Sequence, residues 1–434
     1  MPRMAYLKST LIVLILLVGM SVKADEAAQE VAHPSRCEIG TYRLSDGTML
    51  DIGPGAEGRL RWRLLDGRSG ELEPQKNGRW VSTLGWTRRP DGNVVTISDC
   101  RSGKIRFDDL PGHRQPIIQV DTRFQGSGAV LAGRLTLPAG SDRVPIVVLI
   151  HGAEHFSALE NYSLQRQFAS AGIGVFAYDK RGTGSSGGRY TQNYLILATD
   201  AVLAMREARR LAGARGGRVG YQGGSQGGWV APLAARIEPV DFVIVSFGLA
   251  VSVLDEDREA IELDMDLGGF DPRIKQKAME VADATMTIVA SNFTAGYEQL
   301  ELVKRNYGEE PWFKAIRGNF SKYLLDTPAE ISRKEGAILL EGVPAQYDPM
   351  PVLSNLGTPQ LWLLGGQDRD APSAETARRL TALRKEGRPI TLIVFPNAEH
   401  GMYEFESLEN GERVSTRQPQ GYFDAMRDFI KTGN

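Results

Sequence analysis

From residue 146 onward, short continuous apolar segments alternate with amphipathic segments, and this alternation restricts the chain to few folds. Six apolar segments predict strands, at 146–150, 173–178, 218–222, 242–246, 360–364 and 390–395. Helical periodicity appears between and after them, at 162–171, 193–211, 226–237, 373–385 and 422–431. Strands that are apolar on both faces need helices on both sides, as in parallel sheets. The alternation therefore predicts an α/β fold with a doubly wound, mostly parallel sheet.

One connection in this pattern is far longer than the others. Residues 249–356 show no strong strand signal and are rich in Glu, Met, Ala and Lys. A segment of this length is too long for a structureless loop. We expect a helical cap insertion over the carboxyl edge of the sheet, where open α/β sheets bind ligands. The sheet itself then comprises 119–248 and 357–434.

Residues 25–118, ahead of the sheet, have a different character. Short β-compatible runs are separated by dipeptides typical of tight hairpin turns. These dipeptides are Asp46-Gly47, Asp66-Gly67, Asn77-Gly78 and Asp91-Gly92. The pattern predicts a small antiparallel β-domain that precedes the sheet.

The first 24 residues are typical of a secretory signal peptide. Arg3 and Lys8 precede an apolar run at 11–20, and a small residue, Ala24, follows. The run is about half of the ~20 residues that a spanning helix needs, so an uncleaved anchor is the weaker alternative. We expect cleavage after Ala24, a periplasmic or secreted protein and no stable membrane span thereafter.

An oxidising compartment favours pairing of the two cysteines. Cys37 and Cys100 are the only ones in the chain, so one intrachain disulfide is available, across the β-domain. Two unrelated buried thiols are the alternative. Lys and Arg number 51 against 53 Asp and Glu, so no basic surface indicates a nucleic-acid partner.

Ser225 is the candidate nucleophile. It lies in Gly223-Gly224-Ser225-Gln226-Gly227, between a predicted strand and a predicted helix. A serine raised on a sharp strand-to-helix turn needs small neighbours, because larger side chains would collide. A second Gly-x-Ser-x-Gly match, around Ser186, lacks both the adjoining strand and the helix.

A serine hydroxyl needs a base and an orienting acid to react. Of five histidines, only His400 follows a late strand of the sheet, where the base belongs. Asp368 and Asp370 both follow the preceding strand, and Asp368 is preferred because it lies nearer the strand end.

Oxyanion stabilisation requires two backbone N–H donors near the serine. Gln226 follows the nucleophile, and Ala153 follows Gly152 at the end of the first parallel strand, with Glu154 as second choice. His151 and His155 are four residues apart, but they lie in a glycine turn and have no evident third ligand. We therefore predict neither a metal site nor a cofactor.

Together these motifs resemble the α/β-hydrolase superfamily, from about residue 119 to the C-terminus. The matching features are His151-Gly152, Asp179-x-Arg181-Gly182-x-Gly184-x-Ser186, Gly-x-Ser225-x-Gly, Tyr347-Asp348-Pro349, Gly365-x-x-Asp368-x-x-x-Pro372 and His400-Gly401. Nucleophile, acid and base also follow that family's order. Gly224 and Gln226 depart from many relatives, which leaves the substrate subclass open.

The resemblance is to bacterial serine esterases with a helical cap, and it implies a carboxylic-ester hydrolase acting on a small-molecule ester. A serine peptidase of the prolyl-peptidase type is one alternative, although the segment before the sheet is too short for a propeller of four-stranded blades. A non-catalytic binding protein on a hydrolase scaffold is the other.

Overall fold

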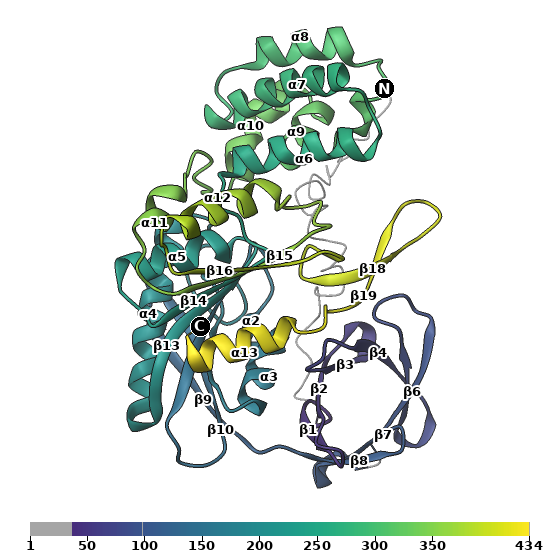
Figure 1. The fold of residues 1–434 in the computed structure, drawn as a ribbon, viewed down its shortest axis with the longest axis vertical. Helices are drawn as coiled ribbons and strands as arrows, with labels where there is room; N and C mark the ends of the chain where they lie inside the picture. The colour runs from purple at the N-terminus through teal and green to yellow at the C-terminus, as the bar shows by residue number, and fades with distance from the viewer. Residues whose placement is uncertain (1–36, 98, 434) are drawn as a thin grey trace, which may run out of the picture.

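The computed structural model describes residues 37–97 and 99–433, and Figure 1 shows three parts along its length. A helical bundle lies at one end, next to the α/β core, and a β-barrel lies beside the part of the core that is farther from the bundle. The predicted signal peptide and the Cys100 side chain lie outside the described residues. Export and the Cys37–Cys100 disulfide therefore remain predictions.

The N-terminal part is a closed antiparallel barrel of eight strands. They are β1 (Gly40–Leu44), β2 (Met49–Pro54), β3 (Leu60–Leu64), β4 (Ser69–Pro74), β5 (Arg79–Thr83), β6 (Pro90–Thr96), β7 (Lys104–Phe107) and β8 (Leu110–Arg114). Pairing of Tyr42 in β1 with Arg114 in β8 closes it. Alternate side chains of β3 (Leu60, Trp62 and Leu64) fill the interior, as the period of a strand requires. The sequence predicts the antiparallel β-domain but not its closure.

The core is a single eight-stranded sheet with the order β16-β15-β14-β13-β11-β12-β10-β9. Its strands are β9 (Ile117–Gln125), β10 (Val130–Pro138), β11 (Val144–Ile150), β12 (Gly174–Tyr178), β13 (Gly216–Gly224), β14 (Phe242–Ser246), β15 (Gln360–Gly365) and β16 (Ile390–Phe395). β11 to β16 are mutually parallel, and the β9–β10 hairpin adds an antiparallel edge. This confirms the predicted fold class.

Helices cover both faces of the sheet. α4 (Tyr194–Ala212), α5 (Gly227–Ile237), α11 (Met350–Asn355) and α12 (Ala374–Lys385) share one hydrophobic core with the strands. α3 (Leu164–Ser170) and α13 (Tyr422–Thr432) pack on the opposite face, and α2 (Ala158–Asn161) precedes α3. Because both faces are covered, the central strands β12 and β14 are buried at every position.

The long connection forms a bundle with a hydrophobic core of its own, separate in Figure 1 from the sheet. It contains α6 (Val253–Leu267), α7 (Pro272–Ala290), α8 (Tyr297–Tyr307), α9 (Asn319–Asp326) and α10 (Ala329–Leu339). α6 begins at a capping box in which Ser252 and Asp255 bond each other's backbone N–H groups. We call these five helices the helical insertion. None of the helices in the described residues is long and apolar enough to cross a membrane.

A three-stranded sheet near the C-terminus was not expected from the sequence. It comprises β17 (Ala398–Glu399), β18 (Tyr403–Ser407) and β19 (Arg413–Arg417). β19 docks on the barrel, where Trp86 N donates to Ser415 O at 2.9 Å. The Trp86 ring also meets the Tyr403 ring edge-on, with centroids 4.8 Å apart. The barrel thus supports the segment that directly follows His400.

Candidate active site

Ser225 occupies a sharp turn between β13 and α5. Its φ is +51°, which an L-residue with a side chain seldom adopts, and its N–H donates to Ser246 O at 3.1 Å. A Cβ on Gly223 would lie 2.6 Å from Gly227 O, so that position tolerates only glycine. The strand-to-helix context predicted for Ser225 is therefore present. Ser186 instead donates its hydroxyl to Asp179 O at 2.6 Å, within the loop after β12.

The structure brings Ser225, His400 and Asp368 together from three separate loops. His400 Nε2 lies 3.1 Å from Ser225 Oγ, and His400 Nδ1 lies 2.9 Å from Asp368 Oδ2. The other carboxylate oxygen, Asp368 Oδ1, accepts the backbone N–H groups of Asp370 and Ala371 at 3.0 and 2.8 Å. These two bonds fix the Asp368 carboxylate while its other oxygen faces the imidazole.

The electrostatic environment of His400 favours its protonated form. Burial disfavours the imidazolium, but the adjacent Asp368 charge outweighs burial and raises the pKa of His400 above its ordinary value. Asp370 and Glu256, which lies in the first turn of α6, act in the same direction. The pKa of His400 therefore lies above the value of about 6.5 that is ordinary for a histidine.

The two predicted oxyanion donors lie in different surroundings. Ala153 is exposed, in the turn after β11, whereas Gln226 is 3% exposed at the start of α5. Within the described residues, neither backbone N–H has an acceptor in the protein. Two unpaired backbone donors on the loops that flank Ser225 are what an oxyanion site requires.

The turn after β11 is held by buried side chains. His151 is 2% exposed, and its Nε2 lies 3.1 Å from Lys180 N. The Glu154 carboxylate accepts Gly152 N–H at 3.2 Å. Burial by itself would raise the pKa of Glu154. Interactions with His151, Lys180 and Tyr162 outweigh burial and lower this pKa to about 2. Among the described residues, no group of three or more acidic, histidine or cysteine side chains forms a metal site.

Gln192 connects Gln226, at the start of α5, to the end of the helical insertion. Gln226 Nε2 donates to Gln192 Oε1 at 2.6 Å, and Gln192 Nε2 donates to Glu341 Oε2 at 2.9 Å. Glu341 lies just after α10, so the end of the insertion is linked through Gln192 to Gln226, the residue next to the nucleophile. No motif in the sequence indicates this connection.

Phe247 is another residue that the sequence analysis missed. A Cβ on Gly224 would lie 2.5 Å from Phe247 Cζ, so the ring occupies the space beside Gly224 that a side chain would need. The same ring meets the His400 imidazole edge-on, with centroids 5.0 Å apart. The glycine at position 224 therefore has a packing reason.

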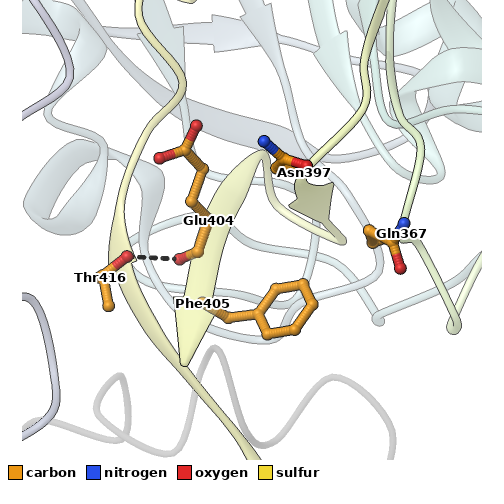
Figure 2. A pocket seen from close by; sticks show the side chains of 5 residues that line it. All are labelled: Gln367, Asn397, Glu404, Phe405 and Thr416. Carbon is orange, nitrogen blue, oxygen red and sulfur yellow. Dashed lines mark hydrogen bonds between the residues drawn. The ribbon is translucent and has the colours of Figure 1, made fainter. Parts of the chain in front are cut away.

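A hollow of about 380 Å³ lies beside the turns that carry the acid and the base. Figure 2 shows its lining residues, which are Gln367, Asn397, Glu404, Phe405 and Thr416. Thr416 Oγ1 donates to Glu404 O at 3.0 Å across β18 and β19. Neither Ser225 nor His400 lines this hollow, so we do not assign it to the reacting group of a substrate.

The fold agrees with that of a known protein family. The model of the alpha/beta hydrolase family matches residues 147–415, from the first parallel strand to β19. The chain belongs to the α/β-hydrolase family. This confirms the family that the sequence motifs indicate.

Solved structures similar to this α/β-hydrolase include an esterase from Pyrococcus furiosus. That pair is 16% identical, covers 65% of this chain and 84% of the other, and has a TM-score of 0.42. An esterase from Pyrobaculum calidifontis is 17% identical over 74% and 87% of the two chains, with a TM-score of 0.43. The acylaminoacyl peptidase of Pyrococcus horikoshii is 14% identical over 88% and 56%, also with a TM-score of 0.43. No curated protein matches the chain.

Proposed function

We propose that this α/β-hydrolase is a serine esterase that cleaves carboxylic esters of small molecules through an acyl-enzyme on Ser225. One observation carries the proposal. Ser225 Oγ, the His400 imidazole and the Asp368 carboxylate form a continuous hydrogen-bonded row, with steps of 3.1 and 2.9 Å. This is the arrangement by which a serine hydroxyl transfers its proton as it attacks a carbonyl carbon.

In the first half-reaction, His400 Nε2 accepts the Ser225 proton while Oγ bonds to the ester carbonyl carbon. Asp368 holds the imidazole by Nδ1 and stabilises the imidazolium that forms. The carbonyl oxygen becomes an oxyanion and accepts the N–H groups of Ala153 and Gln226. When the tetrahedral intermediate collapses, the bond to the alcohol oxygen breaks and His400 returns the proton to the alcohol.

Water completes the reaction. His400 removes a proton from the water as its oxygen attacks the acyl-enzyme carbonyl, and the same two N–H groups bind the second oxyanion. Collapse then breaks the acyl bond to Ser225, which regains its proton from His400. Besides the ester and water, each step uses only side chains and backbone groups of this chain.

We also propose that the helical insertion acts as a cap over this site. Leu263 and Leu267 of α6 line a small cavity of about 40 Å³ together with Asp368. Glu256 of the same helix interacts electrostatically with His400. α6 therefore lies close enough to the proposed catalytic residues to contact a bound substrate.

The experiment combines an activity assay with a covalent probe. We expect hydrolysis of nitrophenyl acyl esters graded by acyl length, and stoichiometric labelling of Ser225 by a fluorophosphonate. Ser225→Ala should abolish both, whereas Ser186→Ala, at the other Gly-x-Ser-x-Gly sequence, should retain labelling. Full turnover by Ser225→Ala would refute the proposal.

The same assays separate the two alternatives. Faster cleavage of an N-terminal dipeptide amide than of any ester would indicate the peptidase. A folded wild-type protein that neither turns over esters nor accepts the probe would indicate a non-catalytic binding protein.

We further propose that the protein is exported and cleaved after Ala24, with a disulfide between Cys37 and Cys100. The sequence of residues 1–24 and the two solitary cysteines support this. Sequencing the N-terminus of protein from the native host should begin at Asp25. Peptide mapping without reductant should recover the two cysteines in one cross-linked fragment.

A further inference from the structure

Lys180 is a buried lysine that the steps described so far do not use. It directly follows Asp179 after β12, and it is 2% exposed, the only lysine that is buried among the described residues. Burial lowers the pKa of its ammonium to about 8, although Glu154 and Glu341 oppose the shift. Burial of an ammonium costs free energy that its contacts must offset. The groups that Lys180 contacts therefore indicate its role.

The Lys180 ammonium contacts the turn after β11. Nζ donates to Gly152 O at 2.7 Å and to Tyr190 Oη at 3.2 Å, and it lies 4.4 Å from the centre of the Tyr190 ring. Tyr190 Oη in turn donates to Ala153 O. The backbone on both sides of Ala153 is thus held by one connected set of bonds.

The atom that Lys180 contacts belongs to the same peptide group as a proposed oxyanion donor. Gly152 C=O and Ala153 N–H share one planar unit, and all described peptide bonds are trans. In a trans peptide the carbonyl oxygen and the amide hydrogen point in opposite directions. An ammonium that fixes the oxygen therefore fixes the direction in which Ala153 N–H points.

The charge of the ammonium also affects the strength of that donor. Hydrogen bonds from a charged donor are stronger than neutral ones, and linked hydrogen bonds polarise one another. A positive charge on Gly152 O draws electron density out of the amide, so the Ala153 N–H becomes a stronger donor. This effect grows as the oxyanion forms on the other side of the peptide.

We propose that Lys180 is a positioning residue of the oxyanion site, whose ammonium aims and polarises the Ala153 N–H through the Gly152 carbonyl. This inference rests on the proposed function, because it assigns a role in the same reaction. Lys180 does not touch the substrate and acts only through the peptide group that it holds.

The test compares Lys180→Met, which keeps the length of the side chain but loses its charge and donors, with the wild type. Loss of a whole oxyanion donor costs about 10²–10³ in kcat, and a donor that is only misaimed should cost about 10- to 100-fold. KM for a nitrophenyl ester should stay within about twofold, because the ground-state carbonyl binds these donors only weakly. Both half-reactions form an oxyanion, so kcat falls whichever is rate-limiting.

A transition-state analogue gives a readout that a purely structural role would not move. A trifluoromethyl ketone that adds to Ser225 places an oxyanion in the same site, so its Ki should rise by the same factor as kcat/KM falls. Lys304→Met is the matched control. Lys304 Nζ also donates to a backbone carbonyl oxygen, Leu324 O at 2.8 Å, but this contact lies within the helical insertion. The control should therefore leave kcat/KM and Ki unchanged.

The outcomes separate this inference from the proposed function. Wild-type kcat and Ki in Lys180→Met would overturn the role of Lys180 and leave the esterase proposal intact, provided that Ser225 is still labelled. A wild type that neither hydrolyses esters nor accepts the probe would overturn both. If Lys180→Met does not fold, Lys180→Gln, which can still donate to Gly152 O without a charge, should lose about 3- to 10-fold in kcat. Unchanged kcat there would also overturn the inference.

Discussion

The ion pair between Asp51 and Arg166 tests how the barrel and the α/β core are joined. Asp51 lies in β2 and Arg166 in α3, and their side chains are 0% and 10% exposed. Arg166 Nε lies 2.6 Å from Asp51 Oδ1, and Nη2 lies 2.9 Å from Oδ2. Removal of one partner leaves the other charge buried and unpaired. We expect Asp51→Leu and Arg166→Met each to destabilise the fold by about 3–5 kcal/mol.

The size of the shift in melting temperature depends on which part of the chain unfolds. At about 2.1 cal/mol/K of unfolding entropy per residue, this loss lowers Tm by roughly 4–6 °C if about 400 residues unfold together. If the barrel alone unfolds, about 75 residues are involved, and the same loss lowers its transition by roughly 20–30 °C. The shift therefore shows whether the barrel and the core unfold as one cooperative unit.

Differential scanning calorimetry of the wild type, both single variants and the double variant measures these shifts. The double variant should be far less destabilised than the sum of the singles, because two apolar side chains leave no unpaired charge. Single variants that melt within 1 °C of the wild type would refute the reasoning, since a buried bidentate pair cannot be lost without cost.

Two further predictions concern the proposed base. Gly85 has a φ of +49°, and a Cβ there would lie 2.4 Å from the backbone of β19. Gly85→Val should therefore separate β19 from the barrel. Because β19 supports the segment that follows His400, this change should loosen that segment and lower kcat. Gly92→Val is the control, because Gly92 also has a positive φ but nothing within 4 Å of its Cβ position, and equal kcat values would contradict this account. Because His400 must be neutral to accept a proton and its pKa is raised, kcat/KM should fall as pH decreases, with a midpoint above pH 6.5. Asp368→Asn should move that midpoint to lower pH in the residual activity, and an unmoved midpoint would assign the titration to another group.

Much of the α/β core could be predicted because its signals are local. Most of the central strands are continuous apolar runs, and each helix repeats its apolar positions within a few residues. The expected strands and helices fall within a few residues of β11 to β16 and of the helices that cover them. The position of Ser225 followed from glycines directly beside it, since the turn requires small neighbours.

Features that depend on distant pairing could not be predicted in the same way. The barrel closes where Tyr42 of β1 pairs with Arg114 of β8. The sequence of neither strand indicates which other strand it will pair with. β18 and β19 are short and only partly buried, so they carry weak periodicity, and their contact with Trp86 joins segments far apart in the chain. A lysine that follows a strand gives no local sign that it will be buried.

By itself the sequence determined the α/β class, the family, the order of nucleophile, acid and base, and the residue types available for each role. It did so because periodicity, turn chemistry and motif spacing are properties of neighbouring residues. Only the tertiary structure decided that Asp368 rather than Asp370 faces His400, that Phe247 packs beside Gly224, and that Lys180 reaches Gly152 O. Such contacts depend on how separate loops meet at the sheet edge, and that geometry is set by long-range packing.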